Sequence, residues 1–249
     1  MSNSTKLSVS ALEIFRNFSG ICNSFALWED GSDVGGTTLK TKSETNGFIG
    51  IAKVAESFPK EFKVYDLGSF LSVVSLFKDP EIIYAGKHGK IKEKDGRNSA
   101  TYSWMAETIA SEKVPEVPAP PIPTTFEVTF DLSASTIKDL IKAGDVLSLD
   151  YVTFTVESKQ VSAVVKAENQ DGGNKDLFDV PHFVKTTGGA NEAKTYVFGM
   201  KLENLRWLLT GDYDLQYIIS AKTSKNYVVV KHKARDLWYF IALDNHKVS

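Results

Sequence analysis

A proline-rich segment near the middle of the chain divides the sequence into two parts. Residues 111–123 read SEKVPEVPAPPIP and hold five of the eight prolines. Proline fixes φ and lacks a backbone donor, so such a segment is excluded from helix interiors and from the inner strands of a sheet. We therefore expect an extended surface connector at 111–123, between an N-terminal domain at 1–110 and a C-terminal domain at 124–249.

The first part is expected to contain two helices and several strands. Apolar residues recur at helical spacing over 9–18, where Ser10 and Glu13 have the form of a capping box. A second helix is predicted to begin after Asp66, a good N-cap, with one apolar stripe along it. The expected strands cover 22–28, 36–43, 47–54, 61–65, 81–85, 90–94 and 98–105.

The second part repeats this order of elements. Residues 132–135 align with residues 7–10 at an offset of 125 and begin a helix that exposes Lys138 and Lys142. A second helix is predicted at 202–209 from the spacing of its leucines. The expected strands cover 125–130, 146–157 with a break near Asp150, 160–168, 176–185, 194–198, 213–220, 226–233 and 237–243.

The duplication predicts an α+β chain of two similar domains, each with two helices packed on antiparallel sheets. A chain of 249 residues is long enough for two such domains. Internal repetition of this kind is typical of pseudosymmetric assemblies, in which equivalent faces lie side by side.

The charge balance argues against an ordinary basic nucleic-acid-binding protein. The formal net charge is −2, and a division after Pro123 leaves −1 in each part. Proteins that hold nucleic acid by neutralising phosphates are usually basic, but positive charge gathered on one face is compatible with this balance. There is no apolar run long enough for a membrane span and no signal-peptide pattern, so we expect a cytoplasmic protein with no membrane association.

Residues for catalysis or metal binding are not grouped in the sequence. The four histidines, His88, His182, His232 and His246, are scattered, and none stands three or four positions from another histidine or from Cys22. The paired glycines lie in polar loops without a phosphate-binding pattern. We therefore expect a protein that is not an enzyme, with no cofactor and no metal.

Five runs of sequence, spread over nearly the whole chain, match one known family. They are Lys6-Leu7-Ser8, Arg16-Asn17-Phe18, the specific run YDLGSFLSVVSL at 65–76, GDYDL at 211–215, and the run at 239–244. In these runs the chain resembles the DNA polymerase processivity sliding clamps of T-even-like bacteriophages, relatives of the eukaryotic replication clamp. The connector at 111–123 lies where that family has its domain joint.

The resemblance implies a DNA clamp fold and a function. Clamps of this family are homotrimeric rings of two similar domains per subunit, with helices around a central hole and sheets outside. Duplex DNA threads the hole without base-specific contacts, and the ring tethers the DNA polymerase for processive synthesis. The clamp loader and a sigma factor or co-activator of late transcription are further partners, in the cytoplasm of the infected bacterial host. The loops at 32–46 and 171–194 look longer than those usual in the family.

The resemblance also places candidate DNA-facing residues on the helices. These are the basic residues Arg16, Lys138, Lys142, Lys201, Arg206 and Lys6. Ring closure is expected to pair an edge strand at 98–105 with one at 176–184 of the next subunit. The candidate interface residues are Asn98, Tyr102, Trp104, Leu177, Phe178 and Val180.

A groove for partner peptides is implied beside the connector. Its candidate residues are Val114, Val117, Pro121, Ile122, Tyr217, Ile241 and Leu243. These residues are equally consistent with a structural role, in which they hold the connector against the sheets. For the whole chain, the alternative function is that of a non-catalytic phage structural or adaptor protein with duplicated β-rich domains, which needs no positive face.

Overall fold

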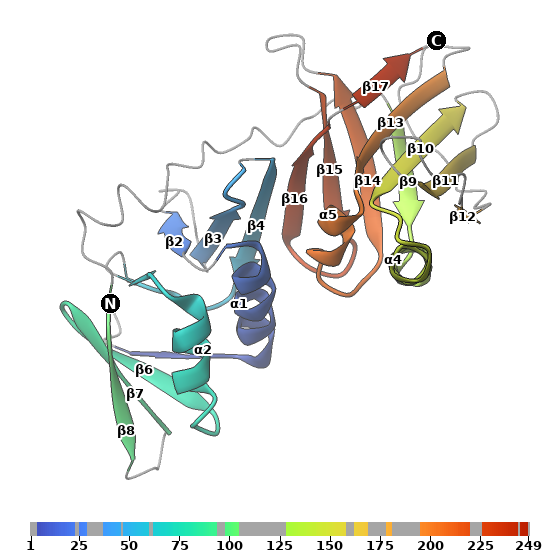
Figure 1. Cartoon of the computed structure of the whole chain (residues 1–249). Coiled ribbons are helices and arrows are strands. Elements are labelled where there is room, and N and C mark those ends of the chain that lie inside the picture. The colour runs from blue at the N-terminus through green and yellow to red at the C-terminus, as the bar shows by residue number, and fades with distance from the viewer. Residues whose placement is uncertain are drawn as a thin grey trace. The chain divides into compact units, whose positions relative to one another are not determined.

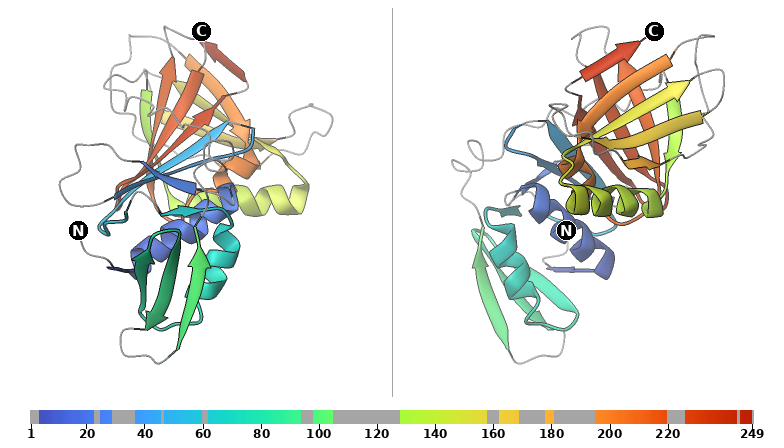
Figure 2. Two further views of the ribbon diagram at one scale, coloured as in Figure 1. Left: turned by 90° about the vertical axis from the view of Figure 1, so that its left-hand side faces the viewer. Right: turned by 45° about the vertical axis from the view of Figure 1, so that its right-hand side comes forward.

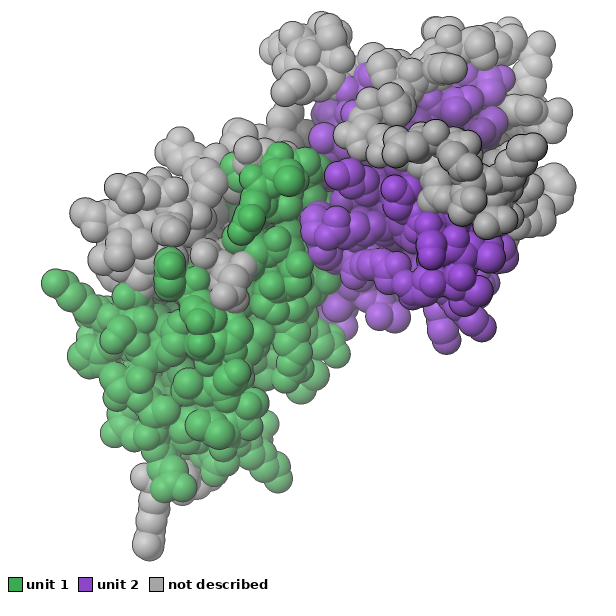
Figure 3. Space-filling view, viewed as in Figure 1, with its two compact units in different colours: residues 1–119 green, residues 120–249 purple. Residues whose placement is uncertain are grey.

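The structure of the chain is a computed structural model that divides into two compact units, Met1–Ala119 and Pro120–Ser249 (Figure 3). The division falls within the proline-rich segment at 111–123, which lies outside the described residues. The described residues are 4–22, 25–28, 37–45, 47–59, 62–93, 98–104, 128–157, 162–168, 178–180, 195–219, 226–243 and 245–248.

Unit 1 contains two helices and two antiparallel sheets among its described residues (Figure 1). The helices are α1 (Val9–Ile21) and α2 (Leu67–Val74). One sheet has the strand order β1 (Ser4–Lys6), β6 (Pro80–Ala85), β7 (His88–Glu93) and β8 (Ser99–Ser103). The other has the order β5 (Lys63–Val64), β2 (Phe25–Trp28), β3 (Thr37–Lys42) and β4 (Phe48–Val54).

Unit 2 also contains two helices and two antiparallel sheets among its described residues. Its helix α4 lies at one end of the strands (Figures 1 and 2). The helices are α4 (Ala134–Leu147) and α5 (Leu202–Arg206). One sheet has the order β9 (Val128–Leu132), β14 (Tyr213–Ile219), β15 (Asn226–His232) and β16 (Leu237–Ala242). The other has the order β12 (Phe178–Val180), β11 (Ser162–Glu168), β10 (Tyr151–Glu157), β13 (Thr195–Lys201) and β17 (Asn245–Val248).

The two units repeat one arrangement, which confirms the predicted duplication and the α+β class. In each, a strand and a helix are followed by four strands, a second helix and three further strands, to which unit 2 adds β17. The sheets correspond as well: β1-β6-β7-β8 has the connectivity of β9-β14-β15-β16, and β5-β2-β3-β4 that of β13-β10-β11-β12. Strand β17, which pairs with β13, has no counterpart among the described residues of unit 1.

The start of α1 corrects one detail of the sequence prediction. The N-cap is Ser8, whose Oγ accepts a hydrogen bond from the backbone N–H of Ala11 at 3.1 Å. The predicted capping box of Ser10 and Glu13 is wrong, because Ser10 already lies inside the helix. By contrast, Asp66 caps α2 as predicted, since its Oδ1 accepts from the N–H of Ser69 at 2.8 Å.

Helix α4 is longer than expected. Residues Val146 and Leu147, which the sequence assigned to a strand, form its last turn, and β10 begins only at Tyr151. A short apolar run does not distinguish the end of a helix from a buried strand, which explains the error. The helix ends where Ser148 adopts the left-handed conformation, with φ 54° and ψ 42°.

Aromatic side chains form the cores of both units. In unit 1 the ring of Phe62 stacks on Phe58 at a centroid distance of 4.7 Å and meets Trp104 edge-on at 5.1 Å. In unit 2 Phe198 joins the two sheets, because its ring stacks on Phe154 of β10 at 5.2 Å and on Tyr217 of β14 at 4.6 Å. Full burial of one such ring stabilises the fold by about 1.5–3 kcal/mol, so these contacts fix how the sheets and helices meet.

Candidate nucleic-acid interface

Helix α4 exposes two of the candidate DNA-facing residues on one face. Lys138 and Lys142 stand four residues apart, so their side chains neighbour each other along the helix. Both are exposed, and neither forms an ion pair with a described residue. The buried residues Ile137 and Leu140 hold the opposite side of α4 against the core. The packing of α4 therefore directs both ammonium groups to solvent.

The short helix α5 contributes a third basic side chain, but that side chain is paired. Arg206 Nη2 lies 2.7 Å from Asp145 Oδ1 of α4. This hydrogen bond lowers the pKa of Asp145 below its ordinary value, so the carboxylate stays charged beside the guanidinium. Lys201, the N-cap residue of α5, is exposed and makes no side-chain cap bond. Of these two candidates, only Lys201 is unpaired within the described chain.

A groove of about 580 Å³ lies between α4 and the segment that begins with α5. Ile137, Leu205 and Leu208 form its apolar floor, and Lys138 and Lys142 stand along it. The surface presented by these helices is therefore a cationic border around an apolar depression.

The helices of unit 1 carry far less charge. The exposed face of α1 contains Arg16, and α2 contains no basic residue. The exposed serines of α2 use their hydroxyl protons locally: Ser72 Oγ donates to Gly68 O at 2.9 Å, and Ser75 Oγ donates to Ser72 O at 2.7 Å. The face of α2 is therefore neutral and has its hydroxyl donors already engaged.

Lys6 does not lie on a helix. It is the last residue of β1, directly opposite Glu81 of β6, and strand alternation places it on the other face of the sheet from the buried Thr5. Its Nζ is 4.0 Å from Asp79 Oδ2. The structure therefore places Lys6 on a strand of unit 1 and not on a helix face.

The candidate groove for partner peptides is only partly described. Val114, Val117, Pro121 and Ile122 lie outside the described residues. Tyr217 and Ile241 are fully buried, and Tyr217 faces the second sheet of unit 2, where it contacts Phe198. Leu243 is half-buried, and its N–H donates to Asn226 O at 3.1 Å. The structure thus places Tyr217 and Ile241 in the core of unit 2 and not on a surface.

The opposite face of the same strands carries apolar residues that the sequence interpretation missed. Ile218, Val229 and Phe240 are also buried, but they alternate with the residues that face the second sheet along β14, β15 and β16, and Val229 pairs directly with Phe240. Trp238, half-buried, lies two residues from Phe240 on this face. We call Ile218, Val229, Trp238 and Phe240 the outer apolar face. The alternation of residues along each strand could have divided them between the two faces of the sheet. It does not show which of these faces packs against the second sheet of unit 2.

Three of the candidate interface residues, Tyr102, Phe178 and Val180, lie on strands at sheet edges. β8 is the last strand beside β7, and β12 the last beside β11, within the described chain. Trp104 is buried and Tyr102 half-buried, and Tyr102 Oη donates to Asp66 O at 2.9 Å, so both rings serve the core of unit 1. Asn98 is exposed and Phe178 half-buried. Leu177 and the side chain of Val180 lie outside the described part.

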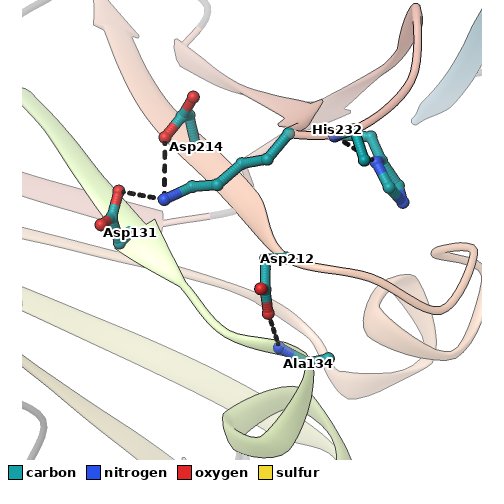
Figure 4. A network of polar contacts seen from close by, with 7 residues as sticks. Asp131, Ala134, Asp212, Asp214 and His232 are labelled. Atoms are coloured by element: carbon teal, nitrogen blue, oxygen red, sulfur yellow. Dashed lines mark hydrogen bonds and ion pairs between the residues drawn. The ribbon is translucent and has the colours of Figure 1, made fainter.

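A polar network ties the start of α4 to β14 and β15 (Figure 4). Lys233 Nζ lies 2.8 Å from Asp131 Oδ1 and 3.5 Å from Asp214 Oδ1, two aspartates that face each other across β9 and β14. The hydrogen bond with Asp131 raises the pKa of Lys233 above its ordinary value. Asp212 Oδ1 accepts from the N–H of Ala134 at 2.8 Å, which anchors the first turn of α4. The network therefore holds α4 in place on the sheet.

Neither a metal-binding cluster nor a membrane-spanning helix is found among the described residues. Among the described residues, no group of three or more His, Cys, Asp or Glu side chains is arranged to hold a metal ion. No helix in the described ranges is both long enough and apolar enough to cross a membrane.

Comparison with known proteins identifies relatives over nearly the full length, although no family model matches the chain. The chain is 27% identical over 208 residues to the sliding clamp of Vibrio phage KVP40, which covers 84% of this chain and 88% of that protein. It is 24% identical over 239 residues to the sliding clamp of Enterobacteria phage T4, with 96% of each covered.

A solved structure shares the fold. A. fulgidus PCNA, bound to the C-terminal region of FEN-1, superposes with a TM-score of 0.64 at 12% identity and covers 97% of this chain and 98% of that chain. Similarity at this identity shows the fold alone, whereas the phage relatives match along the sequence itself. Over most of its length the chain is similar in sequence to sliding clamps of T4-like bacteriophages, and its fold is that of the PCNA structure.

Proposed function

We propose that this chain is a sliding clamp that encircles duplex DNA and tethers a DNA polymerase for processive synthesis, as a scaffold without catalysis of its own. The observation that carries this proposal is the duplicated clamp fold in a chain that aligns with two phage sliding clamps over 84% and 96% of its length. Binding by encirclement needs no base readout and little phosphate contact, which agrees with a net charge of −2.

The helices would face the DNA. Four of the candidate basic residues are exposed and form no ion pair within the described chain, namely Arg16, Lys138, Lys142 and Lys201. Arg206 is partly neutralised by Asp145, which weakens its case as a phosphate contact. Exposed cations without acidic partners retain their full attraction for a polyanion.

Ring closure would join edge strands of neighbouring subunits in a homotrimer. We propose that the edge at 98–105, which contains β8, pairs with the edge at 176–184, which contains β12. Both are edge strands in the described structure, and unpaired backbone groups at such edges readily accept another strand. Sedimentation of the full chain should show a trimer, and a monomer at every accessible concentration would contradict stable closure.

Partner peptides would dock on the outer apolar face of unit 2, beside the connector at 111–123. The alternation along β14, β15 and β16 places Ile218, Val229 and Phe240, all three buried, on the face opposite Tyr217 and Ile241, and the half-buried Trp238 on this face supports it as the docking surface. A. fulgidus PCNA, a protein of the same fold, binds the C-terminal region of FEN-1. Beyond the polymerase, we propose the clamp loader and a late transcription factor as partners, in the host cytoplasm.

The deciding experiment measures retention on circular and on linear DNA. After loading on a nicked circular duplex, the chain should stay bound through gel filtration and be released when the circle is cut, because only threading depends on free ends. Equal retention on both forms would contradict encirclement. No retention on either form would favour a structural or adaptor protein.

A further inference from the structure

The charged residues on the helix faces are unevenly divided between the two units. In unit 2, Lys138 and Lys142 form an exposed pair on one face of α4. In unit 1, the exposed face of α1 holds one basic residue, Arg16, and α2 holds none. The duplicated fold therefore does not present a duplicated charge pattern.

The difference arises at matching positions of the first helices. Counted from the N-cap serines, Lys138 and Lys142 correspond to Glu13 and Asn17. The lysines are exposed, whereas Glu13 and Asn17 are half-buried. The two helices thus share their caps but expose side chains of different charge.

Arg16 on α1 and Lys201 at the start of α5 are single exposed cations, and the rest of these helix surfaces offers little attraction for phosphate. The serine hydroxyls on α2 donate within their own helix, so their outward lone pairs repel an anion. On α5, Arg206 is held by Asp145 at 2.7 Å. An ion pair of this kind must be disrupted or shared before the guanidinium can bind a phosphate strongly.

Given the ring function proposed above, we propose that each chain contacts the DNA phosphates chiefly through Lys138 and Lys142 on α4. The helices of unit 1 then form a nearly neutral surface past which the duplex slides. Electrostatic contact recurs once per chain and not once per repeat, so a ring of identical chains alternates between attracting and neutral sectors.

The test compares matched double variants of the full chain. The first, Lys138→Ser with Lys142→Ser, removes the pair on α4. The second, Ser72→Lys with Ser75→Lys, adds a pair of cations to α2. The control, Lys87→Ser with Lys90→Ser, removes the same charge from exposed positions at the β6–β7 turn and on β7 of unit 1, away from the helices. Binding to a short fluorescent linear duplex is measured by anisotropy over a series of salt concentrations.

Removal of the α4 pair should weaken binding at low salt by about tenfold or more and reduce the slope of log affinity against log salt by about 2 for each α4 in contact. The α2 pair should strengthen binding and steepen the slope, and the control should resemble the unchanged chain. An α4 variant that binds like the control would overturn the proposal.

The same duplex with streptavidin at both ends separates this proposal from the proposed function. Blocked ends should abolish binding of the unchanged chain if it threads onto DNA. Binding that persists on the blocked duplex would contradict encirclement itself. Binding that requires free ends, combined with an unaffected α4 variant, would overturn only the role of Lys138 and Lys142.

Discussion

Ser8 and Ser133 make the same hydrogen bond at the start of the first helix of their units. Each Oγ accepts from the backbone N–H three residues further on, at 3.1 Å in both cases. The bond satisfies one of the N–H groups that the first turn of a helix leaves without a partner. The local signal for the start of the helix is thus shared by the two halves, while the charge on the helix faces is not.

Replacement of either cap should destabilise its unit. We expect Ser8→Ala and Ser133→Ala each to lower the free energy of unfolding by about 1 kcal/mol, because a backbone donor loses its partner. Denaturant unfolding followed by circular dichroism measures the change. Ser72→Ala, within α2, is the control and should be neutral or slightly stabilising, since alanine has the higher helix propensity. Equal effects at Ser72 and the caps would show that the cap bonds contribute nothing.

Lys233 should stabilise unit 2 mainly because its ammonium group offsets the repulsion between the carboxylates of Asp131 and Asp214. Lys233→Met leaves Asp131 and Asp214 opposite each other on neighbouring strands, and we expect a loss on the order of 0.5–1 kcal/mol at low salt, a small value because the site is partly exposed. High salt should shrink the loss, and a second change, Asp131→Asn, should restore part of it. A loss independent of salt would instead point to packing of the lysine stem.

His232 should make the stability of unit 2 depend on pH. The side chain is 5% exposed, its Nδ1 accepts from the N–H of Ala234 at 3.1 Å, and burial lowers its pKa below the ordinary 6.5. As pH falls through 6.5, the unfolded chain binds a proton that the folded chain resists, so the free energy of unfolding decreases toward the folded pKa.

The effect of His232 is measured by comparing the chain with His232→Gln between about pH 7.5 and pH 5. The unchanged chain should lose stability relative to the variant over this interval. The contacts with Thr210 O and Asp212 favour protonation of the ring and Arg235 opposes it, but burial outweighs them, so the pKa of His232 is lowered. Parallel pH curves for the two proteins would show that His232 does not titrate differently on folding.

Partner binding should depend on the outer apolar face and not on the core face of the same strands. Trp238→Ala should weaken polymerase binding in calorimetry, while Tyr217→Phe should leave it unchanged, because Tyr217 lies between the sheets. Val117→Ser with Ile122→Ser should also weaken recruitment and leave the oligomeric state intact. Loss of the oligomer in this last variant would indicate that the connector is purely structural.

The sequence was sufficient to predict the repeat, the helix starts within a few residues and most strands. The three strands at the end of unit 2 were placed within one residue, at Tyr213–Ile219, Asn226–His232 and Leu237–Ala242, because each has a strong β-forming composition. Strand β17 was missed. Its residues, Asn245–Val248, are mostly polar and pair with β13 through the backbone, which leaves no hydrophobic pattern.

The candidate site was harder to predict, because it depends on which face of an element meets the core. Helical spacing correctly placed Lys138 and Lys142 on the exposed side of α4. The ion pair between Arg206 and Asp145 joins residues that are distant in sequence, so no local sequence pattern predicts it. Tyr217 and Ile241 are buried in the same way as Ile218 and Phe240, and only the tertiary structure shows that Tyr217 meets the second sheet through Phe198.

The outer apolar face occurs once in each chain, and this has a consequence for stoichiometry. At the corresponding place in unit 1, strand β7 carries Lys90 and Lys92 on the face opposite the buried Ile91. If partners dock on the outer apolar face, as proposed above, their sites are counted by chains and not by repeats. A closed assembly would bind at most one such peptide per subunit, and a partner with two docking peptides would have to bridge two different subunits.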